Sequence, residues 1–202
     1  MVDPPVVGGR CSGGPAVVVG MVAPTDAIRV AIDVSAVPSR PAGAGQYTLA
    51  LVSALAARDD VALTVLSRHG DDGRWEILAP GAQIMAAAPL ARPVRLAWEQ
   101  TALPILLARR HLDAYHGPHY TMPELARLPR VVTIHDMTFF DNPEWHERTK
   151  IPVFRRAIKV AAKHAAAIIC VSEQTATRLR ERIPPRAPVF VVPHGVDHDR
   201  FR

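Results

Sequence analysis

Residues 28–34 have the sequence IRVAIDV, and a loop at 35–45 separates them from residues 46–58, QYTLALVSALAAR. The first stretch is apolar and β-branched, which is typical of a strand that is buried on both faces. The second repeats apolar residues at helical spacing, with Tyr47 and Leu51 on one face. The pattern therefore predicts a strand and then a helix, which is the repeating unit of a parallel sheet.

The alternation of apolar stretches and helical patterns continues along the chain. Further strands are expected at residues 61–67, 83–87, 112–116, 130–134, 167–171 and 189–192. Helices are expected at 96–110, with an interruption at Pro104, at 152–166 and from Ser172 onward. This order predicts a doubly wound, mostly parallel α/β sheet of the Rossmann-like type, with helices on both faces. In such sheets ligands bind beyond the carboxyl ends of the strands.

The composition suits a single domain of 202 residues, because the hydrophobic share of 49% is enough for a sizeable core. The net charge is +5, but the basic residues are scattered and form no block of the kind that binds nucleic acid, so no nucleic-acid partner is expected. No stretch reaches the roughly 18 apolar residues of a membrane span. Cys11 and Cys170 give no disulfide framework, which fits a reducing compartment, and we expect a cytoplasmic protein.

The regular pattern starts only after a Gly- and Pro-rich extension at residues 1–27. We expect this extension to be disordered, or to precede a true start at Met21. The Rossmann-like domain is expected over residues 28–193, and residues 194–202 follow the last predicted strand.

A glycine loop precedes the first predicted helix, with Gly43, Ala44 and Gly45 next to its N-terminus. Two glycines at such a place allow backbone N–H groups to approach an anion, although a flexible strand–helix connection explains them equally well. A dinucleotide-binding loop would need a third glycine where this chain has Thr48, and a tighter turn after the strand. We therefore expect no nicotinamide or flavin cofactor.

Histidines follow two of the predicted strands. His135 and Asp136 come directly after the strand at 130–134, so His135 could bind a phosphate or a sugar hydroxyl or act as an acid or base. The alternative is that the pair only caps its own loop. His116 and His119 flank a proline, and their spacing matches no known metal frame, so we expect a loop that contacts substrate and no metal site.

Basic residues recur on one face of the helix expected at 152–166, at Arg156, Lys159 and Lys163. A solvated face is the simpler interpretation, and weak contact with the inner membrane surface is the alternative. The next predicted helix has Ser172 at the position of an N-cap.

Six motifs, in this order along residues 28–202, together resemble the N-terminal domain of GT-B-fold, retaining glycosyltransferases of family 4. They are Gly43-Ala44-Gly45-Gln46-Tyr47, Trp98-Glu99-Gln100 with Leu103-Pro104, His116-Gly117-Pro118-His119-Tyr120, Thr133-Ile134-His135-Asp136-Met137, Val171-Ser172-Glu173 and Pro193-His194-Gly195-Val196-Asp197.

The resemblance implies two Rossmann-like domains that face each other across a cleft. The N-terminal domain binds the acceptor, and a C-terminal domain binds the nucleotide-sugar donor. By the same resemblance, residues 43–45 would approach the donor diphosphate, and His135 would contact the transferred sugar near the reaction centre. Other cleft residues would be Tyr47, His119, Asp136 and Ser172.

The resemblance also implies an interdomain hinge at residues 194–202. The hinge residues would be His194, Gly195 and Asp197, and His194 stands where the family usually has Asn.

The expected function is therefore the acceptor-binding half of a retaining hexosyltransferase. It would move a sugar from a nucleotide-sugar substrate to a glycan or lipid-linked acceptor, without a metal or other cofactor. We expect it to be inactive without a donor domain, which could be a separate chain. Two alternatives remain open: a non-catalytic module that binds a glycan or a protein partner, and an unrelated Rossmann enzyme with a nucleotide cofactor.

Overall fold

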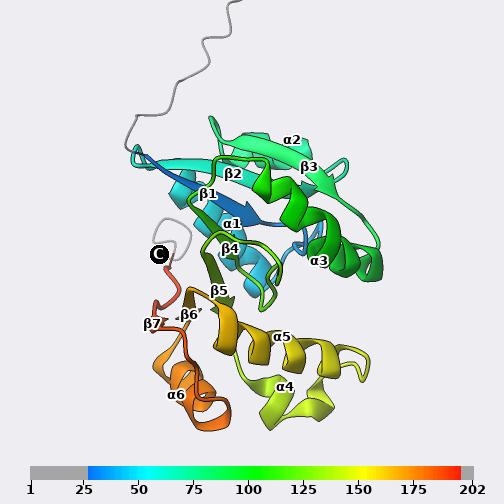
Figure 1. Ribbon diagram of the computed structural model, residues 1–202, viewed down its shortest axis with the longest axis vertical. Coiled ribbons are helices and arrows are strands. Elements are labelled where there is room, and N and C mark those ends of the chain that lie inside the picture. The colour runs from blue at the N-terminus through cyan, green and yellow to red at the C-terminus, as the bar shows by residue number, and fades with distance from the viewer. Residues whose placement is uncertain (1–26, 197–202) are drawn as a thin grey trace, which may run out of the picture.

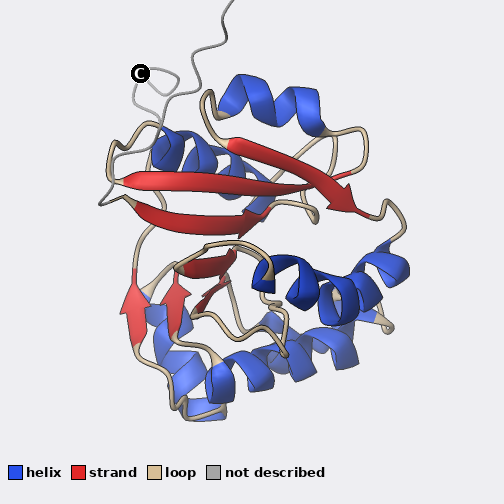
Figure 2. Ribbon diagram, turned by 45° about the horizontal axis from the view of Figure 1, so that its top comes forward, coloured by secondary structure: helices blue, strands red, loops and turns tan. Residues whose placement is uncertain are grey.

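The computed structural model describes residues 27–196, which form one seven-stranded, wholly parallel sheet with helices on both faces (Figures 1 and 2). The strands are β1 (Ile28–Asp33), β2 (Val61–Arg68), β3 (Gln83–Ala88), β4 (Ala114–Gly117), β5 (Arg130–Ile134), β6 (Ala167–Cys170) and β7 (Val189–Val191). The helices are α1 (Ala44–Ala56), α2 (Asp72–Leu78), α3 (Arg92–Ala108), α4 (Thr138–Asp141), α5 (Lys150–His164) and α6 (Glu173–Arg182), with a 3₁₀ turn at Pro143–Trp145. The expected extension up to residue 26, and Asp197 in the expected hinge, lie outside the described residues.

The strand order is β3-β2-β1-β4-β5-β6-β7, so the first strand, β1, lies inside the sheet, between β2 and β4. The chain builds outward through β2 and β3, crosses back by way of α3, and continues from β4 toward the other edge. The reversal lies between β1 and β4, which pair in parallel at Ile32 and His116. The prediction of a doubly wound parallel sheet is confirmed, and the ligand crevice of such a sheet lies at this reversal.

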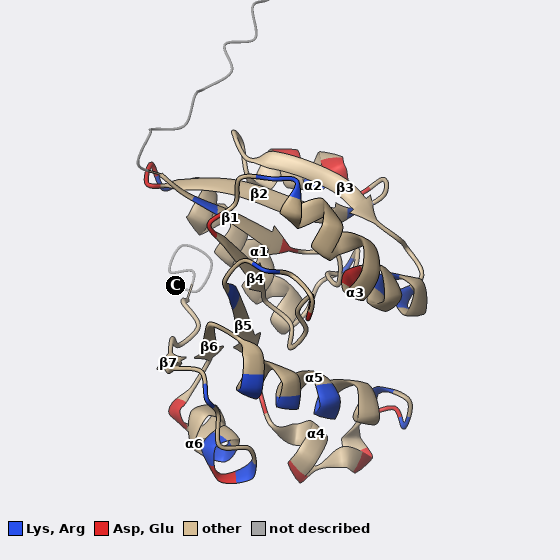
Figure 3. Cartoon of the chain, in the orientation of Figure 1, with Lys and Arg blue, Asp and Glu red and all other residues tan. Residues whose placement is uncertain are grey.

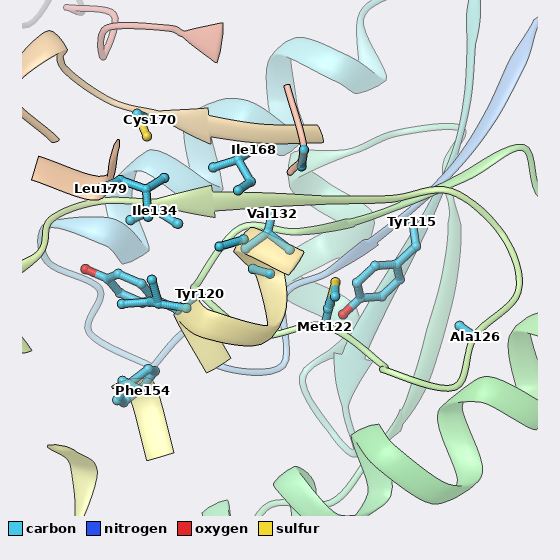
Figure 4. Packing of buried hydrophobic residues seen from close by; sticks show 14 of the residues in the cluster. Tyr115, Tyr120, Met122, Ala126, Val132, Ile134, Phe154, Ile168, Cys170 and Leu179 are labelled. Carbon is cyan, nitrogen blue, oxygen red and sulfur yellow. The ribbon is translucent and has the colours of Figure 1, made fainter. Parts of the chain in front are cut away.

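Two buried clusters hold the helices on the sheet. One packs Val52 of α1 and Trp75 of α2 against β1 and β2. The larger one packs α3, α5 and α6 against β4, β5 and β6. In Figure 4, Leu179 of α6 lies beside Ile134 of β5 and Cys170 of β6, so Cys170 is a small core residue, as its apolar surroundings predict.

Helix α3 differs from the sequence prediction because it starts at Arg92 and runs through Pro104 without interruption. A proline inside a helix removes one hydrogen bond to the carbonyl four residues earlier, here that of Gln100. Burial of Leu103 and Leu107 on the same stripe of the helix offsets that loss. Tertiary packing therefore outweighs the local effect of the proline.

Helix α2 was not expected from the sequence, which predicts no helix between the strands at 61–67 and 83–87. Trp75 is fully buried at its centre and donates its indole N–H to Asp71, at 3.3 Å. Asp71 also accepts from the guanidinium of Arg74 at 3.2 Å. These contacts stabilise a helix of only seven residues between two glycine-containing turns.

The basic face predicted for α5 is partly engaged in an ion pair within the protein and partly exposed to solvent. Phe154, Ile158 and Ala161 are buried against the sheet, as expected from their spacing. On the opposite face Arg156 forms an ion pair with Glu124, whereas Lys159 is exposed. Among the described residues no helix is long and apolar enough to cross a membrane.

Glu99 is an unusual residue for a helix that faces the core. Its side chain is only 3% exposed, and its Oε1 has no hydrogen-bond partner within residues 27–196. Burial, together with the nearby charge of Asp33, raises the pKa of Glu99 from its ordinary value of 4.5 to about 8. The carboxyl group is therefore protonated at neutral pH.

The loop after β4 makes a close approach that only glycine permits. A Cβ atom on Gly117 would lie 2.1 Å from the carbonyl oxygen of Thr121, a backbone atom that cannot move independently. The segment that carries His119 and Tyr120 therefore turns directly over the end of β4.

We expect Gly117→Ala to lower the free energy of unfolding by about 3 kcal/mol, because the added methyl group displaces this loop. Gly73→Ala is the matched control: a Cβ there meets nothing within 4 Å, and the residue lies in α2. Urea denaturation compares the two variants. Equal denaturation midpoints for Gly117→Ala and the unchanged protein would contradict the close approach.

We also expect Glu99→Gln to become progressively more stable than the unchanged protein as pH rises from 4.5 to 8. The folded state holds the Glu99 proton over that range and the unfolded state does not, so rising pH penalises folding only when Glu99 is present. At pH 7 the free energy of unfolding of Glu99→Gln, relative to the unchanged protein, would have risen by up to about 3 kcal/mol from its value at low pH. Denaturation at several pH values measures it, with the exposed Glu76→Gln as control; a gain that does not change with pH would disprove it.

Candidate functional site

The carboxyl ends of β1, β4, β5 and β6 meet at one edge of the sheet, and the predicted site residues gather there. A cavity of about 350 Å³ lies between the ends of β1 and β4 and the helices α3 and α5. A smaller one of about 140 Å³ lies beside the glycine loop. The two share Asp33, Ala36, Pro118 and His119 as lining residues.

The glycine loop reaches the N-terminus of α1 in a conformation that needs its glycines. Gly43 has a φ of 49°, in the region that favours glycine, and no side chain caps the helix that follows. A Cβ on Gly45 would lie 2.8 Å from Cβ of Pro41. The buried Thr48 donates its hydroxyl to the carbonyl of Ala44, so the third glycine of a dinucleotide loop is replaced by a side chain engaged with the helix itself.

His135 is fixed by hydrogen bonds on both its ring and its backbone. Its Nε2 lies 2.8 Å from the carbonyl oxygen of Pro118. A carbonyl only accepts, so Nε2 carries a proton. The backbone carbonyl of His135 accepts from the hydroxyl of Thr175, whose N–H is in turn bound by Ser172 at the start of α6. Ser172 is therefore the N-cap that the sequence predicts.

The imidazole of His135 is neutral at physiological pH. Burial lowers its pKa below the ordinary value of 6.5, and this effect outweighs the hydrogen bond to Pro118, which raises it. With the proton on Nε2, the Nδ1 nitrogen keeps a lone pair. No hydrogen bond within residues 27–196 engages Nδ1, so His135 has an acceptor nitrogen available for a ligand.

Four aromatic rings from three other segments surround His135. The ring of Tyr47 lies edge to face with that of His135, with 5.1 Å between the two centroids. The centroids of Tyr120 and His119 lie 5.7 Å and 6.0 Å from that of His135. His194, which follows β7, stacks on Tyr47 at 4.9 Å. The structure therefore brings together predicted site residues from α1, from the two histidine motifs and from the expected hinge. We call the rings of Tyr47, His119, Tyr120, His135 and His194 the histidine cluster.

Thr133 is a buried residue of the site that sequence reasoning did not single out. Its hydroxyl lies 2.8 Å from Nε2 of His116 and 3.3 Å from the hydroxyl of Tyr47. Burial lowers the pKa of His116 to about 4, so this histidine is neutral and faces the protein interior. A polar residue inside the apolar strand 130–134 was the signal available in the sequence.

Asp136 is engaged within the protein. Its carboxylate accepts from the hydroxyl of Tyr120 at 2.9 Å and from the N–H of Thr138 at 2.9 Å. Tyr120 has a φ of 63°, which is rare for a residue with a side chain, and its N–H donates to the carbonyl of Thr133. Asp136 thus holds the strained loop of Tyr120 in place, which corresponds to the loop-capping interpretation of its sequence position.

Two acidic and two basic side chains in the larger cavity were also missed as site residues. Asp33, at the end of β1, accepts from the N–H of Ser35 at 2.8 Å and from the hydroxyl of Tyr115 at 3.3 Å. Burial raises its pKa above the ordinary value. Glu99, Arg92 and Arg95 line the same cavity from α3. Only the fold brings α3 against the ends of β1 and β4, so no local pattern marks these residues.

Within the described part of the chain, no group of three or more His, Cys, Asp or Glu side chains is placed to hold a metal ion. Nucleotide-sugar chemistry without a metal remains a prediction.

Comparison with known proteins bears on the family and the fold of this chain. The family model described as Glycosyltransferase Family 4 matches residues 41–200. Solved structures of HepE from Anabaena, one in complex with UDP-glucose and one with UDP and glucose, match with TM-scores of 0.53 at 16% identity. They cover 84% of this chain and 44% and 45% of theirs, so the chain spans less than half the length of HepE.

A structure of sucrose-phosphate synthase from Thermosynechococcus elongatus matches with a TM-score of 0.51 at 13% identity, over 86% of this chain and 92% of that one. A search of curated protein sequences found no match. The structural similarities concern the fold alone, while the family model covers most of the sequence. The chain therefore belongs to glycosyltransferase family 4, and its sheet is the N-terminal, Rossmann-like domain of a GT-B fold.

Proposed function

We propose that this domain forms the acceptor-side wall of a cleft in which a hexosyl group passes, with retention of configuration, from a nucleotide sugar to a glycan or lipid-linked acceptor. The observation that carries the proposal is His135: a neutral imidazole at a strand end, with Nε2 bound to Pro118 and Nδ1 available. A hydroxyl of the transferred sugar would donate to Nδ1. The surrounding rings of Tyr47 and His119 would exclude water from that hydrogen bond.

The glycine loop would act on the leaving group. The uncapped N-terminus of α1 carries backbone N–H groups and the positive end of the helix dipole, which favour the developing charge on a diphosphate. Stabilising that charge contributes more to a retaining transfer than a strong base would. The engagement of Asp136 with Tyr120 and Thr138 fits this role, since the carboxylate next to His135 in the sequence is already hydrogen-bonded within the protein. The proposal requires no metal ion and no cofactor besides the nucleotide-sugar substrate.

The reaction would also need a donor-binding domain, on the same polypeptide or on another chain. The exposed apolar residues near the end of the sheet support such a contact: Phe190 of β7 is 55% exposed, Val192 48% and Val196 62%. The exposed His194 and Gly195 follow β7 at the expected hinge. A UDP-hexose is the first donor to test, because a solved structure of HepE contains UDP-glucose. We place this reaction in the cytoplasm.

We expect His135→Ala to lower kcat by about 100-fold or more, because it removes a fixed acceptor that acts at the reaction centre. The assay measures sugar transfer with this domain joined to, or mixed with, its donor domain. His111→Ala is the control, since His111 is exposed at the opposite edge of the sheet. An unchanged kcat for His135→Ala would remove the basis of the proposal.

We expect residues 1–202 alone to release no nucleotide from UDP-glucose or other nucleotide sugars, since the donor site would lie largely on the second domain. Release should begin when a donor domain is supplied. The measurement is coupled detection of free nucleotide with and without that domain. Turnover by residues 1–202 alone would contradict the division of roles between the two domains.

A further inference from the structure

The cavity of about 350 Å³ carries basic side chains on one side. Arg92 and Arg95 come from the first turns of α3, and Lys150 from the start of α5. Figure 3 shows these two helix starts, with their basic residues in blue, on the same side of the molecule. Lys150 pairs with Glu147, but no ion pair or side-chain hydrogen bond within residues 27–196 involves either arginine.

Arg95 is partly buried and has no counterion at contact distance among the described residues. Partial burial lowers its pKa from the ordinary value, and the nearby Asp33 opposes that effect only in part. The guanidinium of Arg92 lies over the ring of Phe154, at 5.6 Å from its centroid. Two partly dehydrated guanidinium groups that face one cavity favour an anion with several oxygens, because each can donate two parallel hydrogen bonds.

The deep end of the cavity has a different chemistry. Glu99 is buried there, with an Oε1 that lacks a partner among the described residues. Its carboxyl is protonated at neutral pH, so it does not neutralise the arginines and can both donate to and accept from a hydroxyl. Ser35 and Asp33 add further polar atoms at the end of β1. The cavity therefore combines an anion-binding side with a hydroxyl-binding floor.

We propose that this cavity binds the acceptor as a phosphorylated polyol: the phosphate group is held by Arg92, Arg95 and Lys150, and the hydroxyls by Glu99, Ser35 and Asp33. The volume suits a molecule of monosaccharide size. This inference rests on the proposed function, because it names the acceptor of the same transfer. Pro118 and His119 line the cavity, and Pro118 also binds His135, so a polyol seated here lies next to the proposed reaction centre.

The phosphorylated polyol could be a free sugar phosphate or the headgroup of a lipid. Calorimetry of this chain with glucose 6-phosphate, glucose and inorganic phosphate tests the free form. Sedimentation with phosphatidylcholine vesicles, with and without phosphatidylglycerol, tests the lipid form. We expect binding of glucose 6-phosphate, of the phosphatidylglycerol vesicles, or of both, and weaker binding of glucose in either case.

The variants Arg92→Gln and Arg95→Gln should each weaken that binding by about tenfold or more, because each removes a charged hydrogen-bond donor. Arg109→Gln is the matched control: it makes the same change of charge at the exposed C-terminal end of α3. Thermal denaturation of each variant confirms that it is folded.

Binding of none of these probes would overturn the inference. So would equal binding of glucose and glucose 6-phosphate, or an equal loss in Arg109→Gln. These results are independent of the transfer assay. If His135→Ala abolishes transfer while the two arginine variants bind phosphate normally, the proposed function stands and this inference fails. Phosphate binding that depends on the two arginines, without any sugar transfer, would instead overturn the proposed function and leave the anion site in place.

Discussion

Parallel pairing of β4 with both β1 and β5 is the constraint on which the rest of the site depends. This short strand lies where the order of the sheet reverses, so its end opens between two helix layers. The glycine at its end lets the chain turn back over the strand, which carries His119 toward the end of β5. Without this pairing, the glycine loop after β1 and the histidine after β5 would have no shared crevice.

A single hydrogen bond from the ring of His135 to the carbonyl of Pro118 then defines the chemistry available in that crevice. It assigns the proton to Nε2, and burial keeps the ring neutral. The ring is thereby oriented as an acceptor, which is a role in positioning and recognition more than in proton transfer. The same loop separates the histidine cluster from the cavity that holds Arg95 and Glu99, so recognition of two different groups can occur side by side.

The sequence was sufficient to predict the parallel sheet, because buried strands are continuous apolar runs and helices repeat at their own period. It was also sufficient for the family, since six short motifs occur in order. It was not sufficient for Pro104 or α2, where burial of Leu103 and of Trp75 outweighs local propensity. Glu99 and Arg95 could not be identified as site residues, because their positions depend on which elements pack together.

The protonation of His135 is the most direct test of this account. Long-range ¹⁵N–¹H NMR spectra of the imidazole nitrogens distinguish the neutral tautomers and the imidazolium ion. At pH 7 we expect a neutral ring with the proton on Nε2 and an unprotonated Nδ1. A proton on Nδ1, or an imidazolium ion at that pH, would contradict the geometry on which the proposed cleft is built.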